Sequence, residues 1–244
     1  MIKFLYANGD SYGFGAELGT GDIHVFDDHK RKYCYSGIIT DTLEIKGYLN
    51  NSIQGGSNER ILRCLITDIP TLLTQYKPEE IFCTVTLSSP ARREFCDNEG
   101  RYMLFLPHHK PAQPGGLIHM NVLWEILVKE FSNDYGIYLY NYMITLSIQS
   151  FLRNLKIPYL ITYSMRTLRE SEIESNFISP DQRALLCANR LYDERSFMEF
   201  VDRDKYPHLT GPGLHPLEDG HQMWAEFLLG HIEKNDLLNN KDLQ

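Results

Sequence analysis

Short runs of consecutive apolar residues alternate along the chain with segments whose apolar residues recur every three or four positions. Runs of the first kind, bounded by turn residues, are typical of buried strands. They predict strands at Ile2 to Ala7, Glu80 to Leu87 and Pro158 to Tyr163, with a shorter one at Ser52-Ile53. The helical spacing predicts helices at Tyr35 to Leu49, from Ser57 or Asn58 past Leu73 with a kink or restart at Pro70, at Met120 to Phe131, at Tyr135 to Leu155 and at Glu218 to Ile232.

Strands that are apolar on both faces and alternate with helices indicate a parallel sheet covered by helices on both sides. We therefore expect an α/β fold, a three-layer α/β/α sandwich around a mostly parallel sheet of roughly five strands. The 244 residues are enough for one such domain, spanning 1–244. Residues 91–118 are rich in proline, glycine and basic side chains, which predicts an irregular insertion with a short hairpin around Tyr102 to Leu106.

The net charge narrows the classes of partner. Lys plus Arg number 24 and Asp plus Glu number 32, a formal charge of −8. Proteins that grip nucleic acids or anionic membranes usually present a basic surface. We therefore expect a small-molecule substrate, and neither a nucleic-acid polymer nor a membrane as partner. The uncharged stretch from Tyr135 to Leu152 contains several polar residues, which indicates a buried helix rather than a membrane span. The oligomeric state stays open.

Cysteine and histidine spacing bears on compartment and metal binding. The five cysteines include no Cys-x-x-Cys pair, so we expect reduced thiols in a cytoplasmic compartment. No spacing typical of a zinc site joins Asp10, His108, His109, His215 and His221. We therefore expect neither a metal nor another cofactor.

Several residues that could take part in catalysis directly follow the predicted strands or lie in the loop before the last helix. Ser11 comes after the first strand, Gly55 after the second, Ser88-Ser89 after the third, and His215 lies in the loop before the last helix. In a parallel α/β sheet the ligand site lies at the carboxyl ends of the strands. These separate segments are therefore expected to meet at one edge.

A serine hydroxyl there is a candidate nucleophile, and it needs a base because its own pKa leaves it unreactive near pH 7. His215 is the candidate base. The backbone N–H groups of Ser11 and Gly55, with the Asn58 side chain, are candidate donors to an oxyanion. Each residue also has an ordinary explanation: Asp10 and Gly55 in turns, Asn58 as a helix cap and His215 as a loop residue.

Taken together, these blocks resemble the SGNH (GDSL) hydrolase superfamily over nearly the whole chain. Ile2 to Ser11, with Gly9-Asp10-Ser11 at its end, resembles the first block with its nucleophilic serine. The stretch from Ser52 to Asn58 resembles the second block, whose glycine helps form the oxyanion hole. Leu214-His215-Pro216 resembles the last block with its catalytic histidine. The resemblance implies a serine hydrolase of flavodoxin-like fold, with Ser11, His215, Gly55, Asn58 and Asp10 in the catalytic group.

Two departures from the family pattern leave roles open. The third block carries Gly-x-Asn-Asp in the family, whereas this chain has Ser88-Ser89-Pro90 with no asparagine, so Asn58, Ser89 or Arg92 is left to replace that donor. The family's aspartate three residues before the histidine is Pro212 here. The orienting group for His215 is then another carboxylate, with Asp202 and Asp204 the nearest upstream, or a backbone carbonyl.

Three hypotheses about function remain, and they differ in the molecule that the protein cleaves or binds. The first is hydrolysis of an ester of a small polar molecule. The second rests on a similarity to tailed-phage members and to phage deoxynucleoside 5′-monophosphatases, which would act in the host cytoplasm. Under that hypothesis Arg92 offers a guanidinium to a phosphate monoester, and Ser89 also takes part in substrate binding. The third is a carbohydrate- or nucleotide-binding module without catalysis, because two of the family's signature residues are missing.

Overall fold

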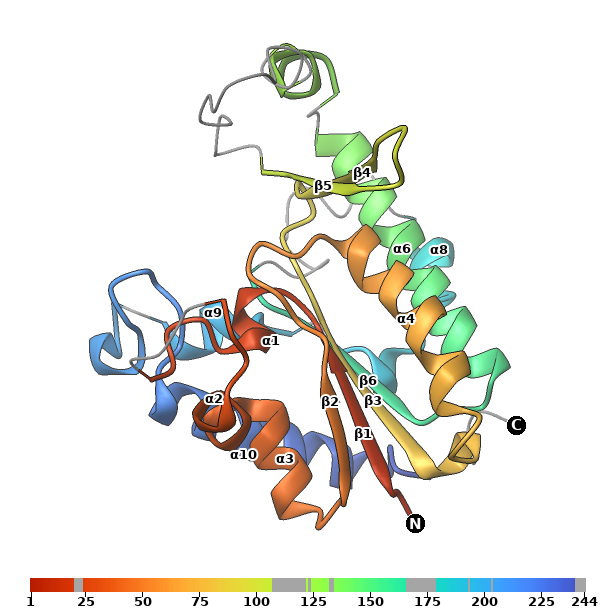
Figure 1. Ribbon diagram of the computed structural model, residues 1–244, viewed down its shortest axis with the longest axis vertical. Helices are drawn as coiled ribbons and strands as arrows, with labels where there is room; N and C mark the ends of the chain where they lie inside the picture. Colours follow the sequence, from red (N-terminus) through yellow and green to blue (C-terminus); the bar gives the residue numbers. More distant parts are fainter. Residues whose placement is uncertain are drawn as a thin grey trace.

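The computed structural model describes residues 1–19, 24–106, 122, 124–131, 134–165, 179–192, 194–202 and 204–239. Four strands form its central sheet: β1 (Phe4–Asn8), β2 (Gly47–Asn50), β3 (Ile81–Leu87) and β6 (Tyr159–Tyr163). They pair in parallel in the order β2-β1-β3-β6 (Figure 1). A single parallel bridge from Leu191 to Ile161 continues the sheet beyond β6. The described sheet thus has four strands and one bridge, where the sequence predicted roughly five strands.

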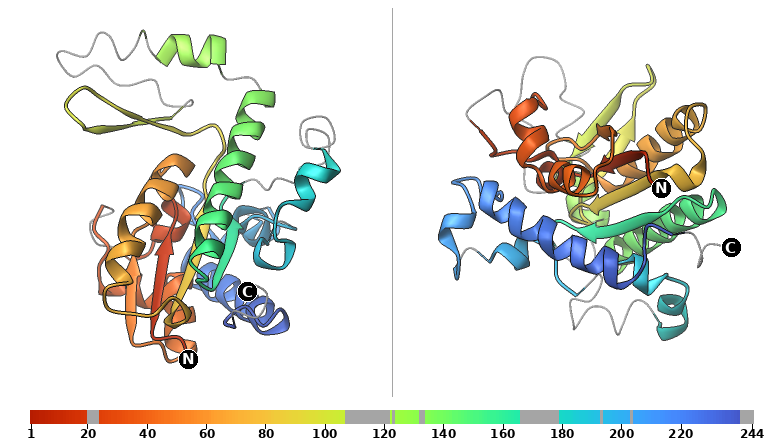
Figure 2. Two further views of the ribbon diagram at one scale, coloured as in Figure 1. Left: turned by 90° about the vertical axis from the view of Figure 1, so that its right-hand side faces the viewer. Right: turned by 90° about the horizontal axis from the view of Figure 1, so that it is seen from below.

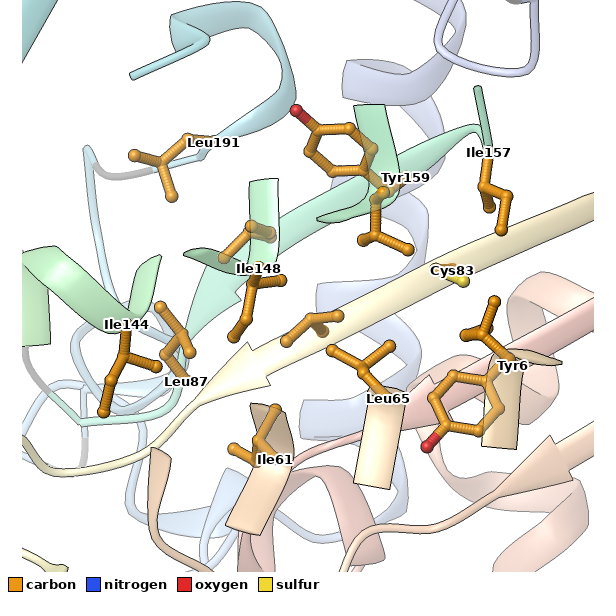
Figure 3. Packing of buried hydrophobic residues seen from close by; sticks show 14 of the residues in the cluster. Tyr6, Ile61, Leu65, Cys83, Leu87, Ile144, Ile148, Ile157, Tyr159 and Leu191 are labelled. Atoms are coloured by element: carbon orange, nitrogen blue, oxygen red, sulfur yellow. The ribbon is translucent and has the colours of Figure 1, made fainter. Parts of the chain in front are cut away.

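Alternating side chains along the strands face two separate hydrophobic cores. Tyr6, Cys83 and Ile161 belong to the core that includes residues of α4 (Asn58–Leu72) and α6 (Asp134–Asn154). Figure 3 shows Tyr6 and Cys83 in this core. Leu5, Phe82 and Leu160 face the opposite core, with α3 (Tyr35–Thr42) and α10 (Glu218–Lys234). Because the central strands are buried on both faces, they carry the continuous apolar runs seen in the sequence. The expected three-layer α/β/α arrangement is confirmed (Figure 1).

The second strand differs from its prediction. The sequence predicted a helix from Tyr35 to Leu49 and a strand at Ser52-Ile53, but the helix ends at Thr42 and β2 occupies Gly47–Asn50. Glu44 takes a left-handed backbone conformation with φ of 56°, which stops the helix. The next residues then pair with Phe4 to Ala7 of β1, so their backbone groups are satisfied by the sheet.

Helix α4 follows the expectation at its start and departs from it near its end. The Ser57 hydroxyl accepts a hydrogen bond from the Arg60 N–H at 3.3 Å and caps the helix, one of the two predicted caps. The helix continues through Pro70 to Leu72 without restarting. Pro70 lies in the last turn, and the helix ends two residues after it.

The predicted insertion contains a hairpin, but it begins at Arg93, and the predicted range of Tyr102 to Leu106 covers only its second strand. Strands β4 (Arg93–Cys96) and β5 (Tyr102–Phe105) pair antiparallel and lie beyond the carboxyl edge of the main sheet (Figures 1 and 2). Bidentate hydrogen bonds of 2.8 Å join Arg63 of α4 to Glu94. An ion pair joins Arg93 to Glu59 of α4. Residues 107–118, including His108 and His109, lie outside the described residues, as do Met120, 121 and 123 of the next predicted helix.

The remaining elements are short. They are α1 (Ser11–Phe14), α2 (Asp28–Tyr33), α8 (Pro180–Ala184), α9 (Phe197–Val201), a π-helical turn at Leu127–Phe131, and 3-10 turns at Pro78–Glu80, Ala188–Arg190 and Pro207–Leu209. Within the described ranges, no helix combines the length and the apolar character that crossing a lipid bilayer requires.

Candidate active site

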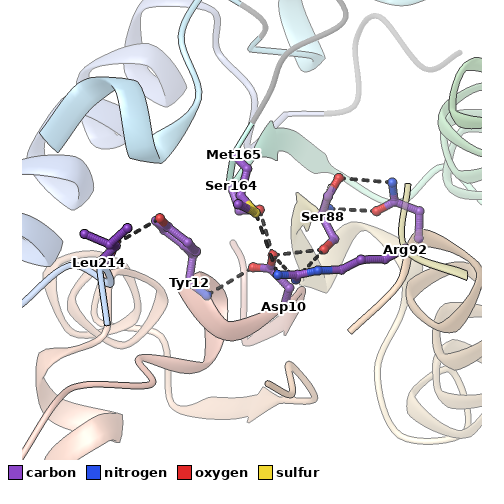
Figure 4. A network of polar contacts seen from close by, with 8 residues as sticks. Asp10, Tyr12, Ser88, Arg92, Ser164, Met165 and Leu214 are labelled. Carbon is purple, nitrogen blue, oxygen red and sulfur yellow. Dashed lines mark hydrogen bonds and ion pairs between the residues drawn. The ribbon is translucent and has the colours of Figure 1, made fainter. Parts of the chain in front are cut away.

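The carboxyl ends of β1, β3 and β6 meet at the side chain of Asp10. Its Oδ2 accepts hydrogen bonds from the hydroxyl of Ser88, just after β3, at 2.9 Å and from that of Ser164, just after β6, at 2.8 Å (Figure 4). Its Oδ1 accepts from the Tyr12 N–H at 3.0 Å and so caps α1. The carboxylate is fully buried. The neighbours β1 and β3 flank the point where the strand order reverses, which is where doubly wound folds place their ligands.

Arg92 completes this network with a positive charge. Its Nη1 lies 3.0 Å from Asp10 Oδ2 and donates to the Ser88 hydroxyl at 2.8 Å (Figure 4). Its Nη2 contacts the Met165 sulfur at 3.7 Å. The Arg92 side chain is 18% exposed, whereas Asp10 is not exposed at all. Arg92 therefore lies at this edge of the sheet, and its charge is matched by a buried carboxylate.

Ser11 is the first residue of α1 and is buried. Among the described residues neither its hydroxyl nor its N–H has a hydrogen-bond partner. The N–H of Gly55 is likewise unpaired there, in a turn held against the first loop by a 3.3 Å bond from the Ile53 N–H to the Gly9 carbonyl. Gly55 has a φ of 72°, a conformation that favours glycine. The first and second predicted blocks thus lie side by side, with unused donors on each.

The side-chain amide of Asn58 is hydrogen-bonded to other residues of the protein. Its Oδ1 accepts from the Ser88 N–H at 2.7 Å, and its Nδ2 donates to the Ser88 carbonyl at 3.2 Å and to Asn141 Oδ1 at 2.5 Å. Both amide hydrogens are therefore in use. This geometry favours a role for Asn58 in holding the loop after β3. Ser89 is half-buried, and its carbonyl accepts from the Arg92 N–H at 3.1 Å.

His215 lies beside Glu17, a residue that the sequence had not singled out. Its Nδ1 is 3.4 Å from Glu17 Oε2, and its backbone N–H donates to the same oxygen at 2.9 Å. The Gly213 N–H donates to Glu17 Oε1 at 2.9 Å. Partial burial raises the pKa of Glu17, but these two N–H groups and the imidazole outweigh it, and the net pKa is lowered.

The loop that carries His215 is also fastened to the Ser11 helix. The Tyr12 hydroxyl donates to the Leu214 carbonyl at 3.0 Å (Figure 4), and the Tyr12 and His215 rings lie 5.3 Å apart. Leu214 has a φ of 67°, a strained conformation for a non-glycine residue. Ser11 and His215, both within the described ranges, are not joined by a hydrogen bond. Such bonds are often long in the absence of substrate and tighten when it binds.

The two carboxylates that the sequence placed nearest to His215 are not its partners. Asp202 pairs with Lys205 at 2.9 Å, and Asp204 is exposed. His221 is fully buried and accepts a hydrogen bond from the Tyr35 N–H at its Nδ1, 3.2 Å away. Burial, with a smaller effect of His215, lowers its pKa to about 3. Among the described residues, no three histidine, cysteine or acidic side chains gather as a metal site would require.

Three residues of this site were missed from the sequence, wholly or in part, and for different reasons. Ser164 follows β6 directly, so the rule that located Ser88 also applied to it. Ser88 was noticed at its strand end but not as a partner of Asp10. Glu17 lies six positions after Ser11 in a loop, and nothing in the local pattern distinguishes it from the other acidic residues.

Residues 22–244 match a sequence family described as a family of unknown function, DUF6071. The chain belongs to this family. The matched region begins after Ser11 and Glu17. No curated protein matches the sequence significantly.

Solved structures provide the second comparison. TesA aligns with a TM-score of 0.54 and 14% identity, over 95% of this chain and 99% of its own. A carbohydrate esterase, whose active site is described as having divergent catalytic and non-catalytic binding functions, aligns with a TM-score of 0.52 and 10% identity, over 95% of this chain and 65% of its own. A member of the lipolytic G-D-S-L family from Veillonella parvula aligns with a TM-score of 0.47 and 10% identity, over 93% of this chain and 96% of its own. Identities this low establish the fold alone, and the fold is the SGNH hydrolase fold that the sequence predicted.

Proposed function

We propose that this protein is an SGNH-type serine hydrolase that cleaves an ester bond of a small polar molecule. One observation carries the proposal: at the carboxyl edge of the sheet, the groups that acyl transfer needs are left without hydrogen-bond partners among the described residues. They are the Ser11 hydroxyl, the N–H groups of Ser11 and Gly55, and Nε2 of His215. Asp10, Asn58, Ser88 and Ser164, by contrast, are held in internal hydrogen bonds.

In the proposed reaction Ser11 Oγ attacks the ester carbonyl carbon and passes its proton to Nε2 of His215. The carbonyl oxygen becomes negatively charged and is stabilised by the N–H groups of Ser11 and Gly55. Collapse of the tetrahedral intermediate breaks the bond to the alcohol, which takes the proton from His215 and leaves an acyl-serine. A water molecule, deprotonated by the same histidine, hydrolyses the acyl-serine and restores Ser11.

The Asp10–Arg92 pair bears on the choice between ester classes. A phosphate monoester is largely dianionic near pH 7 and calls for a cation that is free to meet it. The Arg92 charge is already matched by the buried Asp10 at 3.0 Å, so the pair is close to neutral. This balance favours a neutral carboxylic ester over a nucleoside monophosphate.

A substrate screen tests the proposal. Purified protein is given aryl acetate and butyrate, aryl phosphate and deoxynucleoside 5′-monophosphates, each with and without chelator. We expect turnover of the carboxylic esters that is insensitive to chelator. Ser11→Ala should lower kcat by at least about 1,000-fold with an unchanged melting temperature, because the hydroxyl makes no hydrogen bond within the described fold. Ser147→Ala, on the exposed side of α6, is the control and should keep full activity.

Each other result has a definite meaning. Turnover of phosphate monoesters alone would replace the carboxylic esterase with the nucleotidase. Binding of a sugar or nucleotide without turnover of any ester would favour the non-catalytic module. Carboxylesterase activity retained by Ser11→Ala within a few-fold would remove Ser11 from the mechanism.

A further inference from the structure

The carboxylate beside His215 comes from the loop after α1, not from the segment that precedes the histidine. Glu17 lies 198 positions before His215 in the sequence, yet its Oε2 accepts the His215 backbone N–H at 2.9 Å. The position three residues before the histidine is held by Pro212, which has no carboxylate to offer. An acidic side chain thus reaches the imidazole from the opposite end of the chain.

We propose that Glu17 is the positioning residue for His215, taking the place that Pro212 leaves without a carboxylate. The inference rests on the proposed function, since it assigns a third member to that catalytic pair. It concerns orientation and charge, because Glu17 touches the histidine and not the substrate.

The contacts of Glu17 show that the His215 loop is built around its carboxylate. Both oxygens are bound by backbone N–H groups of that loop, Oε1 by Gly213 and Oε2 by His215, each at 2.9 Å. A Cβ at Gly213 would lie 3.0 Å from Oε2, and one at Gly211 would lie 2.8 Å from the carboxyl carbon. Glycine at these positions leaves the space that the carboxylate occupies.

The imidazole presents the correct edge to this carboxylate. Nδ1 is buried and forms no well-aligned hydrogen bond, and Glu17 Oε2, 3.4 Å away, is the acidic oxygen within ion-pair distance among the described residues. We infer that Glu17 Oε2 accepts a hydrogen bond from Nδ1 in the reactive site. Nδ1 would then carry the proton, and Nε2 on the far edge would be free to accept the proton of Ser11.

Near neutral pH, Tyr12 and His221 beside the Glu17–His215 pair are uncharged. Tyr12 packs against the His215 ring from α1, and burial and the charge of Asp10 raise its pKa, so it stays neutral. His221 of α10 has a pKa of about 3 because of its burial, so it is neutral as well. The pKa of Glu17 is lowered, with the His215 imidazole among the causes, so Glu17 is ionised beside the ring.

The test follows the labelling of Ser11 by an aryl fluorophosphonate, which reports on the serine and its base without a known substrate. Glu17→Gln keeps the size of the side chain and removes its charge. We expect labelling to slow by at least about 100-fold, as loss of an orienting carboxylate costs about 10⁴ in a serine protease.

Three variants and one spectroscopic measurement make the result decisive. Besides Glu17→Gln, Glu17→Asp should recover part of the rate. Glu218→Gln is the matched control, because it removes a second Glu–His pair of the described residues, Glu218 with His29 at 2.9 Å, and should label as fast as the wild type. Nitrogen-15 NMR of His215 should show the Nδ1–H form in the wild type and a shift toward the other tautomer in Glu17→Gln. Melting temperatures identify any variant that fails to fold.

The outcomes separate this inference from the proposed function. If the wild type is not labelled at Ser11, the proposed function fails. If the wild type is labelled and Glu17→Gln reacts at the same rate and with the same His215 tautomer, the role of Glu17 is overturned while the proposed function stands.

Discussion

At the scale of single residues, the ion pair of Asp10 and Arg92 decides what the site can offer. A buried charge is tolerated only when it is paired and hydrogen-bonded. Asp10 meets both conditions through Tyr12, Ser88, Ser164 and Arg92. The carboxylate thereby joins the ends of three strands, while the hydroxyl of the next residue, Ser11, takes no part in the network.

A double-mutant cycle measures the interaction free energy between Asp10 and Arg92. Arg92→Met leaves the Asp10 carboxylate buried without its cation, and we expect a loss of about 3 kcal/mol in the free energy of unfolding. Asp10→Asn should cost a similar amount. The double variant should be more stable than the sum of the two losses implies, by at least about 1 kcal/mol, because each change removes the other's unpaired charge. Urea unfolding at pH 7 provides the values.

The pair of the exposed Arg101 with the half-buried Asp97 is the control for the cycle, and its coupling should be below about 1 kcal/mol. If the losses at Asp10 and Arg92 were additive, the two side chains would not act as a pair, and Arg92 would again be a free cation for an anionic substrate.

At the scale of elements, the β4–β5 hairpin depends on α4 rather than on the sheet. Arg63 of α4 holds Glu94 through two hydrogen bonds and stacks over the Tyr102 ring, 3.7 Å from its centroid. The Glu94 side chain is only 6% exposed, so its charge depends on this partner. The hairpin also places Leu104 next to Gly55, 3.1 Å from the point where a Cβ would be.

Replacing Arg63 should therefore loosen the hairpin before it affects the rest of the fold. In Arg63→Met, we expect the backbone amides of Tyr102–Phe105 to exchange with deuterium at least about 10-fold faster, which corresponds to about 1.4 kcal/mol in local stability. The amides of β3 should be unaffected. Arg101→Met, at the exposed end of the same hairpin, should leave both regions unchanged. Equal acceleration in β3 and β5 would show that the hairpin unfolds only with the whole domain.

At the scale of the whole molecule, one of the two cores contains a buried histidine whose protonation is unfavourable in the folded state. His221 of α10 packs against α3, stacks on Tyr35 and meets the edge of Phe197. Burial lowers its pKa to about 3, whereas a histidine in the unfolded chain titrates near 6.5. The unfolded state therefore binds one more proton than the folded state between these two pH values.

This difference in bound protons determines how the free energy of unfolding changes with pH. The contribution of His221 to stability is present above about pH 6.5 and falls by about 1.4 kcal/mol per pH unit as the pH drops toward 3. His221→Asn keeps an acceptor for the Tyr35 N–H but cannot titrate, so the stability of this variant should fall less steeply over that range. Urea unfolding at several pH values measures the slopes. His208→Asn, at an exposed position, should keep the wild-type slope; an unchanged slope in His221→Asn would mean that His221 is accessible to protons in the folded state.

The sequence by itself determined the layer architecture and the edge at which the candidate site is proposed. Continuous apolar runs identified β1, β3 and β6, because strands buried on both faces must be apolar throughout. The position of Ser11 after the first of them placed the candidate nucleophile. The second strand was misplaced because Gly47–Asn50 pairs at an edge and carries no such run.

Only the tertiary structure decided which partners the site residues have. Hydrogen bonds between side chains depend on positions that the chain brings together from far apart, and sequence spacing carries no record of them. Arg92 was expected to face a substrate or a surface acid, yet it pairs with Asp10, 82 positions away. Glu17 reaches His215 across 198 positions because the two loops meet, and the absent aspartate at Pro212 could be noticed in the sequence but not replaced from it.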